Sequence, residues 1–143
     1  MKFRYILLTT FVLVAVFFIW HSMPHTPPLR TITIGSATFQ VEVADTESAR
    51  ELGLGERASL PAGRGMLFVF DTPGSQGMWM KDMRFPLDII WAREDGTITT
   101  VLHDVATSTY PEAFYSKTPD ASYVVELNAG AASGIFEGER IVF

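Results

Sequence analysis

Cysteine is absent from the 143 residues of this chain. Its absence excludes disulfide bonds, zinc–thiolate centres, a cysteine nucleophile and the lipid-modified cysteine of a bacterial lipoprotein. Basic residues are also few, with eleven Lys and Arg against sixteen Asp and Glu and a formal net charge of −5. A nucleic-acid partner is not expected, because phosphate binding requires a concentrated positive field.

Histidine is scarce as well, and His103 is the only one of the three that follows residue 30. No Gly-x-Ser-x-Gly motif occurs, so a Ser-His-Asp triad is not expected. Thioether and imidazole groups together suit Cu(I), although methionine is also a common filler of hydrophobic cores. The residues that raise this possibility are His103, Met66, Met78, Met80 and Met83. Since they form no repeated Met-x-x-Met array, we expect no metal and no cofactor.

Charge is missing altogether from residues 5–20, which follow Lys2 and Arg4. At about 1.5 Å per helical residue this run is about 24 Å long, slightly less than the hydrocarbon core of a bilayer. Bulky side chains occupy residues 17–21, where a cleaved signal peptide would carry small ones, and this favours an uncleaved anchor. We therefore expect residues 1–22 to be a signal anchor in a bacterial inner membrane. The positive N-terminus then leaves the rest facing the periplasm or the extracellular side.

Three prolines in residues 23–29 predict an extended spacer, so that one domain occupies residues 30–143. Apolar alternation or short apolar runs predict strands at residues 31–34, 39–43, 66–70, 87–92, 97–102, 123–127 and 140–143. A short helix is expected to end at Leu52, with Asp45 or Thr46 as its N-cap. Residues 71–77 read as a turn, 103–122 as a long loop and 128–132 as a helical turn. The pattern predicts a mainly β fold, a sandwich or squashed barrel with one or two short helices, behind a hydrophobic N-terminal helix.

Several short motifs follow one another in a distinctive order. They are VEVADT at residues 41–46, ELGL at 51–54, GMLFVF at 65–70, WMKDM at 79–83, PLDII at 86–90 and VEL at 125–127, followed by Gly130 and by Gly138-Glu139. In this order they resemble the domain of unknown function 192 family (DUF192) over residues 39–143. The resemblance implies an all-β, jelly-roll-like domain, often behind a signal or anchor. It implies no reaction, because the family has no established activity.

The richest segment for a site is residues 77–88, GMWMKDMRFPLD. If residues 78–81 are extended, Trp79 and Lys81 share one face, with Asp82 and Asp88 close in sequence. A flat indole, a cation and carboxylate acceptors suit a sugar or another polar small ligand. Alternatively, Trp79 belongs to the core and Lys81 pairs with a carboxylate at a sheet margin.

Glu126 interrupts an otherwise apolar strand. It either points to solvent or is buried opposite Lys81 or Arg50 with a shifted pKa, which would mark a site.

The aromatic residues further along the domain either form an exposed rim or fold onto the core. They are Trp91, Tyr110, Phe114 and Tyr115.

We therefore expect a membrane-anchored, extracytoplasmic β domain that binds a polar small ligand, a glycan or an envelope partner without catalysing a reaction. The membrane contact would run through residues 5–20. The ligand-binding residues would be Trp79, Lys81, Asp82, Asp88 and Glu126. A carboxylate-dependent hydrolase acting on glycan is the first alternative, and a structural or interaction module without a ligand site is the second.

Overall fold

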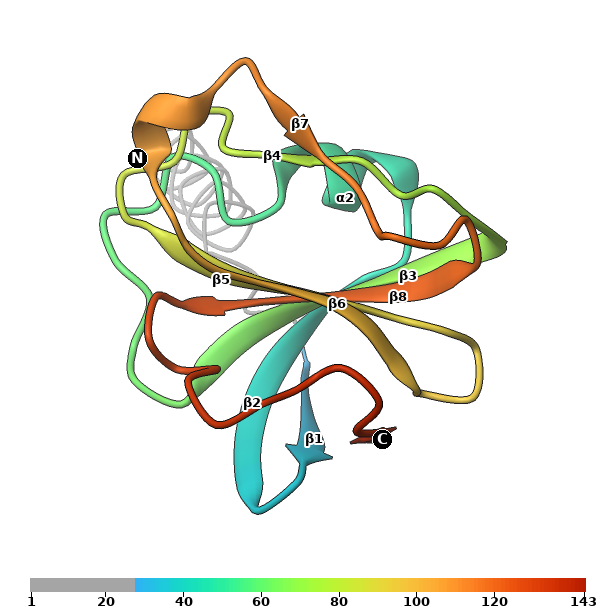
Figure 1. Cartoon of the computed structure of the whole chain (residues 1–143). Coiled ribbons are helices and arrows are strands. Elements are labelled where there is room, and N and C mark those ends of the chain that lie inside the picture. The colour runs from blue at the N-terminus through green and yellow to red at the C-terminus, as the bar shows by residue number, and fades with distance from the viewer. Residues whose placement is uncertain (1–27) are drawn as a thin grey trace, which may run out of the picture.

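The structure is a computed structural model that describes residues 28–143 (Figure 1). The anchor predicted for residues 1–22, and all but the end of the spacer predicted for residues 23–29, lie outside the described residues. Within the described part, no helix has the length and apolar character needed to cross a bilayer.

The described residues are mainly β, as the sequence predicts. In chain order the elements are β1 (Leu29–Ile34), β2 (Ala37–Ala44), α2 (Glu47–Leu52), β3 (Arg64–Gly74), β4 (Met78–Trp79), β5 (Leu87–Ala92), β6 (Ile98–Val105), the 3-10 turn η1 (Thr107–Thr109), β7 (Ala113–Phe114), β8 (Ala121–Asn128) and β9 (Ile141–Val142).

Seven strands form one large sheet in the order β6-β5-β8-β3-β2-β1-β9, and β4 pairs with β7 in a two-stranded ribbon. The large sheet curls strongly, so a half-barrel describes it better than a two-sheet sandwich does (Figure 1). Its neighbouring strands are antiparallel except β2 and β3, which are parallel. A parallel pair needs a crossover connection, and here that crossover carries α2.

Helix α2 begins and ends where the sequence predicts. The Thr46 hydroxyl accepts a hydrogen bond from the Ala49 backbone N–H at 3.2 Å, which caps the N-terminus. Gly53 ends the helix with a positive φ of 52°, a conformation that glycine adopts without steric cost.

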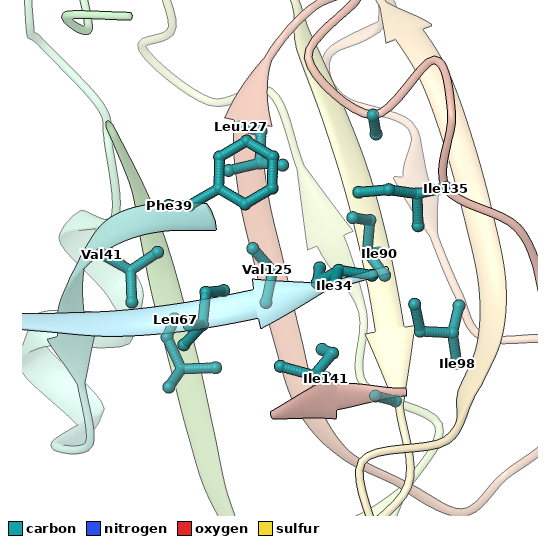
Figure 2. Close-up of a cluster of buried hydrophobic side chains, with 13 residues drawn as sticks. Ile34, Phe39, Val41, Leu67, Ile90, Ile98, Val125, Leu127, Ile135 and Ile141 are labelled. Atoms are coloured by element: carbon teal, nitrogen blue, oxygen red, sulfur yellow. The ribbon is translucent and has the colours of Figure 1, made fainter. Parts of the chain in front are cut away.

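The sheet has a hydrophobic core on each face because its central strands are buried on both sides. The first core includes Val125 and Leu127 of β8, together with Leu67, Ile90 and Ile34 (Figure 2). The second core contains residues that alternate with these along the strands, among them Val124, Phe68 and Trp91. In Figure 1, α2 and the β4–β7 ribbon lie on one side of the sheet, with β1 and the C-terminal segment on the other.

Three local predictions are wrong, each because a distant contact outweighs the local signal. Strand β3 continues to Gly74 instead of turning at residue 71, since Gly74 pairs with Ala121 of β8 after a bulge. The predicted loop 103–122 contains the end of β6, η1, β7 and the start of β8, because β6 pairs with β5 and β7 pairs with β4. Residues 129–132 form turns instead of a helical turn, and the Asn128 side-chain amide instead donates to the Leu60 carbonyl at 2.8 Å.

Candidate functional site

A cavity of about 230 Å³ lies between α2, β3, β4 and β8. Its apolar lining comes from Leu52, Leu54, Phe68, Phe70, Met78 and Met83. Ionisable groups from three separate segments also line it: Glu47, Arg50 and Glu51 of α2, Lys81 and Glu126. Trp79 completes the lining, so the cavity combines a flat aromatic ring with several polar groups.

Glu126 is the buried polar group of this cavity. On β8 it pairs in register with Met66 of β3 and Ile89 of β5, so its side chain points to the face of the second core. Only 3% of the residue is exposed. Burial raises the pKa of its carboxyl to about 8, and no hydrogen bond or ion pair from residues 28–143 offsets that burial. The group is therefore mostly protonated at neutral pH and can donate a hydrogen bond into the cavity.

The two cations of the cavity differ in their contacts. Arg50 is fixed, because its Nη1 donates to the backbone carbonyls of Asp45 at 2.9 Å and Val69 at 2.8 Å. Its guanidinium also lies 5.3 Å from the centre of the Phe70 ring. Lys81 is exposed and makes no ion pair with any other described residue. Lys81 can therefore turn toward a bound molecule.

Three of the five residues that the sequence predicts as ligand-binding meet at this cavity: Trp79, Lys81 and Glu126. Asp82 lies beside it, in a neighbouring shallow hollow that Lys81 also lines. Its backbone has a φ of 57°, and its carbonyl accepts a hydrogen bond from the Glu56 N–H at 2.8 Å. Asp82 is thus adjacent to the cavity without lining it.

Asp88 lies outside this cavity, on the other face of the sheet. It pairs in register with Leu127, whereas its neighbour Ile89 pairs with Glu126. Directly opposed residues of an antiparallel pair share a face, so Asp88 faces the first-core side and Glu126 the second-core side. Asp88 is fully buried, and the imidazole Nδ1 of His103 lies 3.8 Å from its Oδ1.

Helix α2 supplies groups to the site that the sequence does not identify as ligand-binding, namely Glu47 and Glu51. They reach the cavity because the crossover from β2 to β3 carries α2 over the second core. Predicting this from the sequence would require knowing that β2 and β3 pair in parallel. Nothing in the local pattern of residues 37–74 reveals that pairing.

The methionines and histidine considered for copper do not converge. Met66, Met78 and Met80 are buried in the second core, whereas His103 lies beside Asp88. Among residues 28–143, no three His, Asp or Glu side chains are grouped so that they could hold one metal ion.

The aromatic residues divide between the two alternatives left open by the sequence. Trp91 is fully buried and its Nε1 donates to the Gln76 carbonyl at 2.8 Å. Phe114 packs against the second core. Tyr110 and Tyr115 are exposed.

The chain is similar to known proteins in sequence and in structure. A family model described as "Uncharacterized ACR", DUF192, matches residues 30–143. The chain belongs to the DUF192 family. No curated protein matches it significantly.

Two solved structures resemble the chain along most of its length. A proposed transcription regulator of Sinorhizobium meliloti 1021 is 31% identical, with a TM-score of 0.76, and the match covers 82% of this chain and 95% of that one. A protein of unknown function from Novosphingobium aromaticivorans DSM 12444 is 25% identical, also with a TM-score of 0.76, over 85% of this chain and 89% of that one. The fold is therefore shared with both structures, while the site must be interpreted from its own residues.

Proposed function

We propose that this DUF192 chain binds a neutral, polyhydroxylated ring compound of the sugar class in the cavity, without converting it. The observation that carries the proposal is Glu126, a buried carboxyl that lines the cavity and has no partner among the described residues. Among the described residues, the only fully enclosed side-chain nitrogen or oxygen without a partner is Ser122 Oγ, so the Glu126 carboxyl oxygens are open to the cavity. A ligand hydroxyl in the cavity can accept a hydrogen bond from the protonated carboxyl.

The other groups of the cavity favour a ligand that is polar but uncharged. Two cations, Arg50 and Lys81, are balanced by Glu47 and Glu51 when Glu126 is protonated. The half-exposed indole of Trp79 supplies a flat apolar surface for one face of a ring. The cavity is smaller than sites for drug-sized ligands, which measure about 300–1,000 Å³. A single ring with several hydroxyl groups meets these conditions.

The proposal includes the location that the N-terminal sequence indicates. Residues 5–20 carry no charge and follow Lys2 and Arg4, which supports an anchor in the bacterial inner membrane with the domain on the periplasmic or extracellular side. Envelope sugars would then be within reach. Protease treatment of spheroplasts should degrade the domain while cytoplasmic markers survive; protection of the domain would contradict this location.

Binding can be tested on the full chain in detergent by calorimetric titration with a panel of neutral monosaccharides. We expect at least one to bind, and Trp79→Ala to weaken that binding at least about tenfold, a change of about 1.4 kcal/mol. Phe136→Ala is the matched control, because Phe136 is also an exposed aromatic residue, 64% accessible, and does not line the cavity. Absence of binding to the whole panel, or equal loss in both variants, would contradict the proposal.

Hydrolysis of a glycan is the second candidate, and one observation favours it. Glu126, with its raised pKa, resembles a general acid, and Glu47 and Glu51 line the same cavity as potential second carboxylates. Asp88 does not fit that role, because it lies on the other face of the sheet. Release of reducing ends from a glycan, lost in Glu126→Gln, would favour the hydrolase; binding without product would favour the first proposal.

The description of the Sinorhizobium protein suggests transcription regulation as a further function. Of the eleven Lys and Arg, Lys2 and Arg4 precede the domain, so nine remain in residues 28–143 against sixteen Asp and Glu. That negative balance opposes binding to phosphate backbones. We therefore do not extend this function to the chain.

A further inference from the structure

The β4–β7 ribbon presents two exposed aromatic rings beside the cavity. Met78 pairs with Phe114 and Trp79 with Ala113 in antiparallel register, which sets Gly77 opposite Tyr115. Met78 and Met80 are buried in the second core, so the alternate residues Gly77 and Trp79 face outward. Trp79 is 49% exposed and Tyr115 55% exposed.

Gly77 determines where the Tyr115 ring lies. A Cβ atom on Gly77 would be 2.8 Å from Cε1 of Tyr115, closer than real Cβ contacts, and 3.3 Å from Cζ. The ring therefore lies on the bare backbone of Gly77, which itself lines the cavity. Diagonal neighbours on one face of an antiparallel pair are about 7–8 Å apart, so Trp79 and Tyr115 form two adjacent parts of one surface.

We propose that this Trp79–Tyr115 surface extends the cavity into a site for a chain of at least two linked sugar rings. The inference rests on the proposed function, since one ring must occupy the cavity. The cavity holds about 230 Å³, which leaves no space inside for a second ring. The next ring lies against Tyr115, whose flat face packs on it and whose hydroxyl is available as a hydrogen-bond donor.

A sugar chain fits this surface better than a protein partner does. A stable protein interface buries about 800 Å² on each partner, whereas two partly exposed rings on two-residue strands offer only a few hundred. The surface is also continuous with the cavity through Trp79 and Gly77. A linear ligand that starts at Glu126 and leaves past Trp79 would reach Tyr115 next.

The test compares oligomers of different length on the full chain in detergent. Neutral β-1,4-linked N-acetylglucosamine and α-1,4-linked glucose, each with one to four rings, are titrated calorimetrically. In at least one series we expect the Kd to fall at least about tenfold between one ring and two or three. Tyr115→Ala should abolish this gain and leave the Kd of the single ring unchanged. Tyr115→Phe should keep most of the gain.

Two further variants separate a stacking role from a general loss of structure. Gly77→Ala should also abolish the gain, because its methyl group displaces the Tyr115 ring while the tyrosine is retained. Phe136→Ala should keep the full gain. If single rings bind but added rings do not improve the Kd, or if Tyr115→Ala retains the improvement, the extended site is wrong while the proposed function stands. Absence of binding to every ring and oligomer overturns both.

Discussion

Asp88 of β5 accepts a hydrogen bond at 2.7 Å from the backbone N–H of Ala132, which lies 44 residues further along the chain. Its other carboxylate oxygen accepts from the Asp104 N–H at 2.9 Å. One buried side chain thus ties the end of β6 and the segment after β8 to β5. A residue that sequence reasoning assigns to ligand binding therefore acts in this structure as an anchor for two backbone segments.

Asp88→Asn is expected to lower the free energy of unfolding by about 2–4 kcal/mol. The amide nitrogen of asparagine would face one of the two N–H donors, so one buried donor loses its charged acceptor. Urea unfolding followed by circular dichroism measures the change as a lower midpoint with an unchanged slope. Asp71→Asn is the matched control, because Asp71 is exposed. Equal midpoints for the two variants would show that Asp88 is not an anchor.

The regular strands could be predicted from the sequence because their signals are local. In β2, Phe39 and Val41 are buried and alternate with the exposed Thr38 and Gln40, which is the period of a strand with one buried face. The continuous apolar run 66–70 likewise belongs to a strand that contributes to both cores. Such patterns depend only on which face of its own strand each residue occupies, so they can be read without knowing how the strands pair.

The composition of the site could be predicted only in part, because it depends on pairing between distant strands. Trp79 and Lys81 are neighbours in sequence, and both line the cavity. The register of β5 against β8 decides whether Asp88 or Glu126 lies on the same face of the sheet as the cavity. A shift of one residue would move a side chain to the opposite face. Tyr115 comes beside Gly77 only through the ribbon, whose two-residue strands leave no periodic signal.

Glu126 is expected to make stability fall as the pH rises. Its pKa is about 8 in the folded chain and near 4.5 when unfolded, so the folded state holds the extra proton between these values. Stability from this group is then greatest below about pH 4.5 and decreases toward pH 8, by at most about 1.4 kcal/mol per pH unit. Glu126→Gln should remove the slope and be more stable than the natural chain at pH 8.

Unfolding midpoints in urea at pH 5, 6.5 and 8 measure this effect. Comparing the natural chain with Glu126→Gln at each pH cancels the contributions of the ionisable groups that the two chains share. Glu112→Gln, at an exposed glutamate, serves as the control and should follow the natural chain at every pH. If the urea midpoints of Glu126→Gln and the natural chain changed equally with pH, the Glu126 carboxyl would not be held in its protonated form.

Gly65→Ala is expected to destabilise the sheet by about 2–4 kcal/mol. A Cβ atom on Gly65 would lie 2.6 Å from the Glu126 backbone oxygen and 2.6 Å from Cδ2 of Leu127. Gly65 also pairs directly with Leu127, so β3 and β8 would have to separate, and overpacking of this kind is costly. The floor of the cavity would shift with them.

Thermal unfolding of the full chain measures the loss as a lower Tm. The control is Gly134→Ala, where an added Cβ meets no atom within 4 Å and the backbone needs no positive φ. That variant should unfold within about 0.5 kcal/mol of the natural chain. If both variants lowered the Tm equally, the close approach of β3 to β8 at Gly65 would not be the cause.

The Glu42–Arg57 pair joins β2 to the loop between α2 and β3, and its contribution should depend on pH. The Arg57 Nη1 and Nη2 groups donate to the two carboxylate oxygens of Glu42 at 2.6 and 2.8 Å. This hydrogen bonding lowers the pKa of the Glu42 carboxyl against the opposing effect of partial burial. Its stabilisation is therefore complete above the unfolded value of about 4.5 and is lost as the pH falls through the lowered pKa.

Glu42→Gln is expected to cost about 1 kcal/mol at pH 7, since the pair is bidentate but a third of the Arg57 side chain is exposed. In acid the cost should shrink, because the natural chain then loses the same charge by protonation. Urea unfolding at pH 7 and pH 3 gives both values, and adding Arg57→Gln to each background gives the coupling energy. A cost that is equal at the two pH values, or a coupling energy near zero, would show that the ion pair does not hold this loop to β2.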